Sequence, residues 1–129
     1  MIFIKFGIMK TLLSITAVFE CLTGIALIAI PSTIVPMLLG IPFDDDRLHV
    51  ISGITGAALI SIGMVCWLLR NSGASALAIV KSVLFYNVAG TLILLYAILG
   101  LQMTAIGLWP VTIIHFVMAM WCMTVLVKK

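Results

Sequence analysis

The chain has 129 residues, of which 64% are hydrophobic and only 9% are charged, and its mean hydropathy is +1.38. Such a composition cannot cover a water-exposed surface with polar groups, so the solvent of this chain must be largely lipid. The formal net charge of +3 comes from basic residues that are scattered beside apolar runs, and this distribution argues against nucleic-acid binding. Because one helix needs about 20 apolar residues to cross a bilayer, the length allows about four spans and no separate soluble domain.

The first predicted span covers residues 11–30. A short head that carries Lys5 and Lys10 precedes it, and both lysines are placed to meet cytoplasmic headgroups. Pro31 cannot continue the helix and therefore ends it. No cleavage site of small residues follows the apolar run, so we interpret the segment as a retained helix rather than a signal peptide.

The connection between the first and second spans contains a short apolar run at residues 34–39, followed by Gly40. This run predicts a short helix that lies in the outer interface of the membrane. Residues 44–46 are all aspartates and precede the second span, where carboxylates favour the positive end of a helix dipole. With His49 they could bind a divalent cation, but their spacing matches no metal motif, and we predict no metal site.

The remaining spans are predicted at residues 50–69, 78–100 and 108–127. Lys81 makes the start of the third span ambiguous, because it either marks the interface or extends toward it from within the helix. Trp109 and Pro110 suit the first turn of the fourth span, since an interfacial indole and an early proline are both favourable there.

The basic residues predict the orientation of the chain. Placing all of them except Arg47 on one side satisfies the positive-inside rule with both termini in the cytoplasm. We therefore predict an all-α integral membrane bundle of four transmembrane helices, a single domain of residues 1–129 with both ends inside, multi-pass in a bacterial inner membrane. The residues assigned to the inner side are Lys5, Lys10, Arg70, Lys81, Lys128 and Lys129.

Each span carries a stripe of small or polar residues, which in lipid usually marks the side that faces other helices. In the second span the stripe is almost purely small and predicts close helix packing rather than chemistry. Its members are Gly53, Gly56, Ala57, Ile60 and Gly63, with Ser52 and Ser61 at its borders.

The other stripes contain the candidate functional residues. Glu20 lies near the middle of the first span, and an ionisable group at that depth is a functional candidate by default. If the first and fourth spans are neighbours, His115 lies at a similar depth and is the natural partner of Glu20. The predicted ligand-binding or proton-handling residues are Glu20, His115, Asn87, Thr23, Thr112 and Tyr86. The alternative is that they only hold the helices in register through interhelical hydrogen bonds.

No catalytic or cofactor motif accompanies these residues. The sequence contains no phosphate-binding loop, dinucleotide fingerprint, zinc-protease helix or nucleophile elbow, so an enzyme is the less favoured hypothesis and no cofactor is predicted. Cys21, Cys66 and Cys122 all fall within spans without paired spacing, and we interpret them as small apolar residues.

One stretch of the sequence resembles a known family. The run Phe19–Gly24 (FECLTG), the two prolines of the first connection, and the pattern R-x5-G-x2-G-A-A-L-I-S-I-G-x3-W-L-L-R from Arg47 to Arg70 resemble bacterial DoxX-like four-helix membrane proteins. The resemblance covers about the first half of the chain. It implies an accessory membrane subunit of a redox or detoxification system, with a quinone or a partner protein as context.

The preferred hypothesis is therefore an integral membrane protein that binds a small apolar or amphiphilic ligand, lipid-like or quinone-like, or serves as an accessory subunit of a membrane complex. The alternative is a small proton-coupled transporter that uses Glu20 and acts as an oligomer. Small multidrug-resistance transporters also have four short helices with a glutamate in the first, but this chain has a longer first outer loop and a strong orientation bias. The lipid bilayer is the one predicted partner, and a homo-oligomer or a larger complex stays open.

Overall fold

The computed structural model describes the backbone of residues 2–127 and the side chains of residues 6–127. No strand occurs within this part of the chain, which confirms the predicted all-α class. Four segments are long and apolar enough to cross a membrane, so the chain is a multi-pass integral membrane protein. The helices are α1 (Ile2–Ala29), α2 (Pro31–Leu39), α3 (Asp46–Leu69), α4 (Ala74–Leu95), which continues into the π-helical turn η1 (Tyr96–Gly100), and α5 (Leu108–Val127).

The break between α1 and α2 follows from proline chemistry. α1 begins at Ile2, so the head that was expected to precede the first span is part of the same helix. Pro31 is the first residue of α2, where its fixed φ suits a helix start and its missing N–H removes no bond. Gly40 ends α2 in the left-handed conformation with φ +68°, and its N–H bonds to the Pro36 carbonyl at 2.8 Å. The short helix expected in the first outer loop is present.

Two other helix starts differ from the expected spans. α3 begins at Asp46, because the Asp45 carboxylate caps it by accepting the Arg47 backbone N–H at 2.8 Å. α4 begins at Ala74, so Lys81 lies on an exposed position about 10 Å inside the helix rather than at its end. Lys81 therefore does not mark where the helix begins. Lys128 and Lys129, which support the predicted orientation, lie outside the described residues.

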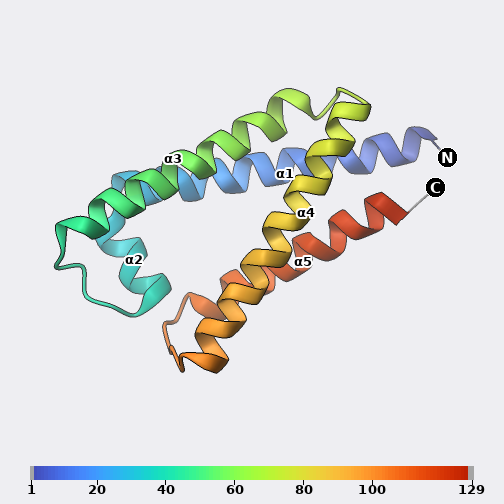
Figure 1. Ribbon diagram of the computed structural model, residues 1–129. Helices are drawn as coiled ribbons and strands as arrows, with labels where there is room; N and C mark the ends of the chain where they lie inside the picture. The colour runs from blue at the N-terminus through green and yellow to red at the C-terminus, as the bar shows by residue number, and fades with distance from the viewer. Residues whose placement is uncertain (1, 128–129) are drawn as a thin grey trace.

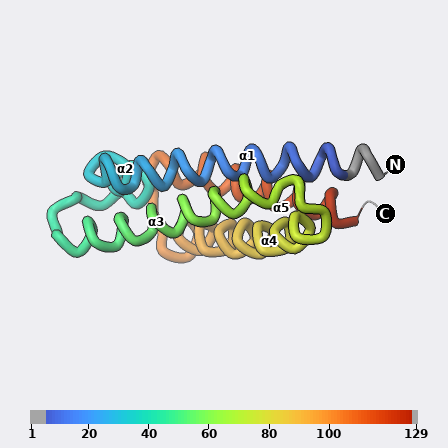
Figure 2. Tube along the Cα trace, turned by 90° about the horizontal axis from the view of Figure 1, so that it is seen from above, coloured from blue at the N-terminus to red at the C-terminus, as the bar shows by residue number. Residues whose placement is uncertain are grey.

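The long helices form two antiparallel pairs rather than a ring of equal neighbours (Figure 1). α1 packs mainly against α3, and α4 packs mainly against α5. The pairs converge near the first and last described residues and diverge toward α2 (Figure 1). Figure 2 shows that these two chain ends lie at the same end of the molecule. The sequence suggested that α1 and α5 could be neighbours; they do touch, but each has its main partner elsewhere.

Glycines allow the close approach of α1 and α3. A Cβ built on Gly24 would lie 2.5 Å from the Gly56 carbonyl oxygen, and one on Gly56 would lie 2.5 Å from that of Gly24. Gly63 is equally confined, against Cys21. The predicted packing stripe is wrong at two of its members, because Gly53 has open space around it and Ala57 is exposed. The buried face of α3 instead runs through Ser52, Gly56, Leu59, Gly63 and Cys66.

Two apolar clusters fill the bundle at different depths. The larger one lies where the pairs converge, and its buried members include Leu12, Val80 and Cys122. The smaller one joins α1, α2 and α3 through Leu27, Val35 and Leu59. Glu20, a buried polar residue of α1, lies in the chain between Ala17 of the larger cluster and Leu27 of the smaller one. Asn87, a buried polar residue of α4, follows Val83 of the larger cluster by about one helical turn. The fold therefore places polar groups in the region where the helix pairs begin to separate.

Candidate functional site in the membrane-spanning region

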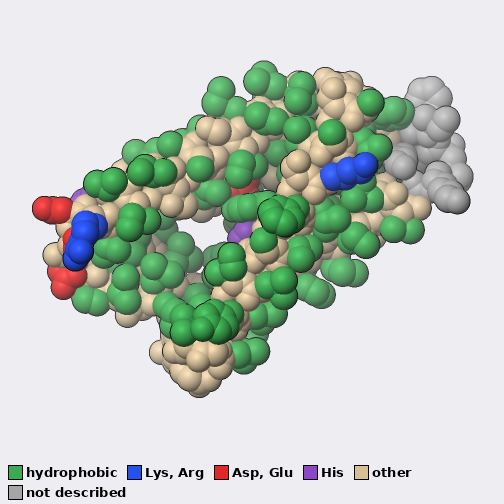
Figure 3. Space-filling view, in the orientation of Figure 1, with side chains coloured by type: hydrophobic (Ala, Val, Ile, Leu, Met, Phe, Trp, Pro, Cys, Tyr) green, Lys and Arg blue, Asp and Glu red, His purple; other side chains and the backbone are tan. Residues whose placement is uncertain are grey.

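A cavity of about 320 Å³ lies between the diverging helix pairs, with α2 on one side. Four of its lining residues are polar and come from three helices: Glu20 and Thr23 from α1, Tyr86 from α4 and His115 from α5. Figure 3 shows an opening between the two pairs on an otherwise mainly hydrophobic face, with acidic and histidine side chains at its edge. The remaining lining residues are Phe19, Leu22, Ala26, Ile34, Met37, Leu38 and Val111.

Glu20 and Tyr86 form the first polar contact of the site. The Tyr86 hydroxyl donates to Glu20 Oε2 at 3.4 Å, which is long for an O–H···O hydrogen bond. Glu20 is only 5% exposed, and it lines the cavity. Among the described residues, every fully buried side-chain oxygen or nitrogen has a hydrogen-bond partner. Glu20 Oε1 has none, so it is not fully buried and keeps some accessible surface. Glu20 therefore presents one oxygen that a ligand can reach.

His115 is held by Asn87. Its Nδ1 lies 3.0 Å from Asn87 Oδ1, and the Asn87 amide nitrogen donates to the Val83 carbonyl at 2.8 Å. Gly90 lies directly beside the ring, since a Cβ there would be 3.1 Å from His115 Nδ1. The imidazole is thus fixed between an amide and a helix backbone, with its other nitrogen free to face the cavity.

The expected direct bond between Glu20 and His115 is not what the structure shows. Within the described residues each has a different partner, Tyr86 for Glu20 and Asn87 for His115. The Tyr86 ring makes an edge contact with the His115 ring, with 5.3 Å between centroids. Their matching depths agree with the finding that both residues line one cavity, but depth alone does not reveal that the aromatic side chain of Tyr86 contacts both.

The two threonines of the predicted set have different positions. Thr23 lines the cavity, and its hydroxyl donates to the Phe19 carbonyl at 2.9 Å. Thr112 is buried, donates to the Leu108 carbonyl at 2.6 Å, and does not line the cavity. Asn87 also stands behind the cavity wall rather than in it. The structure thus brings Glu20, Thr23, Tyr86 and His115 to one cavity and leaves Asn87 as the support of His115.

Sequence reasoning missed the wall that α2 contributes. Ile34, Met37 and Leu38 line the cavity, although the sequence indicated only an interfacial helix there. The Gly107 N–H bonds to the Met37 carbonyl at 2.9 Å, which ties the end of α2 to the turn before α5. A Cβ on Gly107 would lie 2.8 Å from the same oxygen, so the glycine permits the contact. The glycine was the only local signal, and its partner is remote in sequence.

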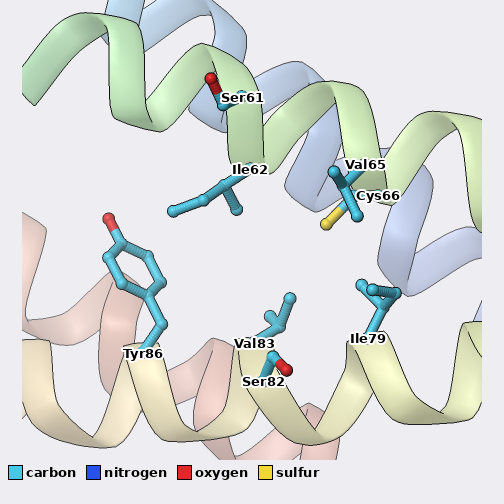
Figure 4. A pocket seen from close by; sticks show the side chains of 8 residues that line it. All are labelled: Ser61, Ile62, Val65, Cys66, Ile79, Ser82, Val83 and Tyr86. Carbon is cyan, nitrogen blue, oxygen red and sulfur yellow. The ribbon is translucent and has the colours of Figure 1, made fainter.

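A second cavity of about 370 Å³ lies between α3 and α4, and its lining is mainly apolar, with hydroxyl groups from Ser61, Ser82 and Tyr86 (Figure 4). Ile62, Cys66 and Val83 line it, and Tyr86 stands at one end. Because Tyr86 also lines the first cavity, this side chain is a shared wall between the two spaces.

The acidic loop before α3 has structural contacts of its own. Asp45 forms a salt bridge with Arg47, whose Nε lies 2.8 Å from Asp45 Oδ2. The ring of His49 packs edge-on against Phe43, with 4.5 Å between centroids. No group of three potential ligands suited to a metal ion was found among the described residues. Of the residues considered for a cation site, Asp45 thus caps α3 and His49 packs against Phe43.

The fold and cavity define a class: a multi-pass membrane protein whose two helix pairs enclose a partly polar cavity. No protein-family model, characterised protein or solved structure matches the chain.

Proposed function

We propose that this membrane protein binds a small amphiphilic molecule, lipid-like or quinone-like, in the cavity between its helix pairs. The observation that carries the proposal is the convergence of Glu20, Tyr86 and His115, from three helices, on a cavity of about 320 Å³ whose other walls are apolar. Ligand sites typically combine such apolar walls with a few placed polar groups, at volumes of about 300–1,000 Å³.

The surroundings of the cavity favour a ligand that arrives from the bilayer. Leu22, one of the lining residues, is 63% exposed on a helix that we place in lipid, so the space extends to the lipid-facing surface. An amphiphile in the membrane would place its head between Glu20 and His115 and its chain against the apolar walls. By the DoxX-like resemblance, such a protein would serve as an accessory subunit in a bacterial inner membrane.

Native mass spectrometry of protein released from membranes tests this proposal. We expect a bound small molecule on the parent protein, and a much lower occupancy in Ala26→Leu, which places extra volume at a lining residue. Ala58→Leu is the matched control because Ala58 is exposed on α3, away from the cavity. A parent protein that carries no small molecule and takes up none from added lipid or quinone would contradict the proposal, as would equal loss in both variants.

A proton-coupled transporter is the second candidate, and Tyr86 is the observation that favours it. This side chain separates two cavities on different sides of the bundle and bonds to the intramembrane Glu20. Transport requires that one site opens in turn to each side of the membrane, and a residue shared by two cavities is a candidate for controlling such access. Transport predicts that substrate binding releases protons from the parent protein and not from Glu20→Gln, whereas simple binding predicts no Glu20-dependent release.

A further inference from the structure

The hydrogen-bond donors of the cavity are already used within the protein. Among the polar lining residues, the Thr23 hydroxyl donates to the Phe19 carbonyl and the Tyr86 hydroxyl donates to Glu20. The backbone N–H groups of the surrounding helices are committed to helical bonds. What the cavity offers to a ligand therefore depends on Glu20 and His115.

The partners of Asn87 determine the protonation pattern of His115. The Val83 carbonyl can only accept, so the group of Asn87 that faces it must be the amide nitrogen, and Oδ1 faces His115. An amide oxygen can only accept, so His115 Nδ1 must carry the hydrogen. In the neutral imidazole, Nε2 is then a lone-pair acceptor. No described residue donates a hydrogen bond to Nε2. Since every fully buried side-chain nitrogen or oxygen in the described part of the chain has a partner, Nε2 keeps some accessible surface.

Glu20 adds a second acceptor beside the first. Its Oε2 receives the Tyr86 hydroxyl, and its Oε1 is unbonded. Both residues line the same cavity, on α1 and α5, with the ring of Tyr86 against that of His115. Acceptors from opposite helix pairs thus line one cavity, and Tyr86 contacts both residues that carry them.

We infer that the ligand head is a hydrogen-bond donor, a hydroxyl-bearing or ammonium-bearing group that bridges Glu20 and His115. This inference rests on the proposed function and specifies its ligand class. A head with acceptors alone, such as an ester, an ether or an oxidised quinone, would leave Nε2 facing another lone pair, and it would do the same to Glu20 in its ionised form. The donor head comes either as a neutral diol, such as a hydroquinone, or as a primary ammonium on an alkyl chain.

Matched probe pairs test the inference on the full chain in detergent micelles. One pair is 2-decylhydroquinone, kept anaerobic, and its dimethyl ether; the other is dodecylammonium and dodecyltrimethylammonium. Within each pair the chain is constant, and methylation replaces every O–H or N–H donor of the head by a methyl group. We expect the donor member of at least one pair to bind about tenfold or more tightly than its blocked partner, measured as bound fraction by native mass spectrometry over a concentration series.

Each outcome has a defined meaning. Preference for the hydroquinone over its ether supports the inference with a neutral diol as the source, and preference for dodecylammonium over its trimethyl analogue supports it with an amine. Equal binding within both pairs would overturn the donor head and leave ligand binding intact. Binding of none of the four probes would overturn both the donor head and the proposed function.

Two variants assign the preference to the named atoms. Glu20→Gln adds an N–H donor at constant size, and His115→Phe removes both ring nitrogens at similar volume. We expect either change to reduce the preference within the pair from about tenfold toward equality. Thr55→Ala, on an exposed position of α3, is the control and should keep the full preference. A preference that survives both cavity variants would overturn the assignment, even if one variant folds poorly.

Discussion

At the scale of single residues, the site is organised by groups that do not themselves reach the cavity. Asn87 is buried and turns His115 by accepting from its Nδ1, while Gly90 leaves room for the ring against α4. Supporting groups of this kind fix the tautomer and orientation of an imidazole much as they do around metal-bound histidines. The chemistry offered by His115 is therefore decided on α4, although the residue belongs to α5.

We expect Asn87→Leu to release His115 from its single tautomer. The change removes the acceptor of Nδ1–H and leaves a ring nitrogen without a partner, so the free energy of unfolding should fall by about 1–3 kcal/mol. The tautomer is measured by ¹⁵N NMR of protein labelled at histidine, where His49→Gln assigns the signals because the chain has two histidines. An unchanged Nδ1–H signature in Asn87→Leu would show that Asn87 does not hold the ring.

The capping residue of α3 gives a pH-dependent prediction. The Arg47 guanidinium and backbone N–H hold the pKa of the Asp45 carboxyl below its ordinary value. Because the folded-state pKa is lowered, this carboxylate stabilises the fold fully above its unfolded pKa of about 3.9, and the contribution is lost as the pH falls through the lowered folded value. We expect Arg47→Gln to return the pKa of Asp45 toward its ordinary value in a ¹³C carboxyl NMR titration.

The chain makes that titration tractable. It has four acidic residues, so the carboxyl signals are few, and Asp45→Asn identifies the relevant one. Two titration curves that coincide in the parent and in Arg47→Gln would contradict the role of the guanidinium. Because the Asp45 side chain is 35% exposed and that of its partner Arg47 is 85% exposed, water screens their ion pair, and the pKa rather than the overall stability is the quantity to compare.

At the scale of elements, two helix interfaces of different character set the shape of the molecule. The α1–α3 interface is close because glycines meet across it, whereas the two pairs contact each other mainly near the termini and separate toward α2. Small residues at interfaces are the usual means of close association in lipid, where apolar burial between helices gives little advantage. The α1–α3 pair and the α4–α5 pair therefore stand on two sides of the cavity that Glu20 and His115 line.

Gly56→Ala and Gly53→Ala form a matched test of that interface. An added methyl at Gly56 meets the Gly24 carbonyl oxygen at 2.5 Å, so we expect a loss of about 1–3 kcal/mol in unfolding free energy. At Gly53 nothing lies within 4 Å, and alanine should be neutral or stabilise by up to about 1 kcal/mol through helix propensity. Unfolding in mixed micelles, followed by circular dichroism, measures both. Similar losses in the two variants would refute the assigned interface.

The sequence was sufficient for some elements and not for others, for physical reasons. Hydropathy revealed four apolar runs, Pro31 indicated the end of the first span, and Gly40 indicated the end of the short helix, because these signals are local. The short helix begins at Pro31, three residues before the apolar run at residues 34–39 that predicted it. The inner face of α3 was misplaced at Ala57, since a stripe of small residues does not specify which side meets a partner. The part of α2 in the cavity wall was missed because it depends on a tertiary contact between Met37 and Gly107.

At the scale of the whole molecule, the polar groups of the cavity lie in the region where the two helix pairs diverge. Where the pairs converge, the interior is apolar and filled, and where they separate, Glu20, Tyr86 and His115 face a cavity beside α2. A bundle of equal neighbours would have packed these side chains against one another. The splayed arrangement instead leaves them in reach of a molecule from the surrounding lipid.

The orientation of this splayed bundle in the membrane is the remaining prediction. Both described chain ends and the turn at residues 70–73 lie at one end of the molecule, and the acidic loop and the turn at residues 101–107 lie at the other (Figure 1). The positive-inside rule places the first end in the cytoplasm, because Arg47 is the lone basic residue assigned to the second and is paired with Asp45. Single cysteines test this in a chain whose Cys21, Cys66 and Cys122 are replaced by alanine.

In intact cells, a membrane-impermeant maleimide should label Asp44→Cys and Gln102→Cys, and it should label Ser72→Cys only after permeabilisation. The three positions lie in or beside connections between helices, so each should be accessible from its own side of the membrane. The reverse pattern would place the acidic loop inside and contradict the rule for this chain. It would also move the cavity, which lies toward α2, into the inner half of the membrane, so the labelling result fixes the leaflet from which a ligand reaches Glu20.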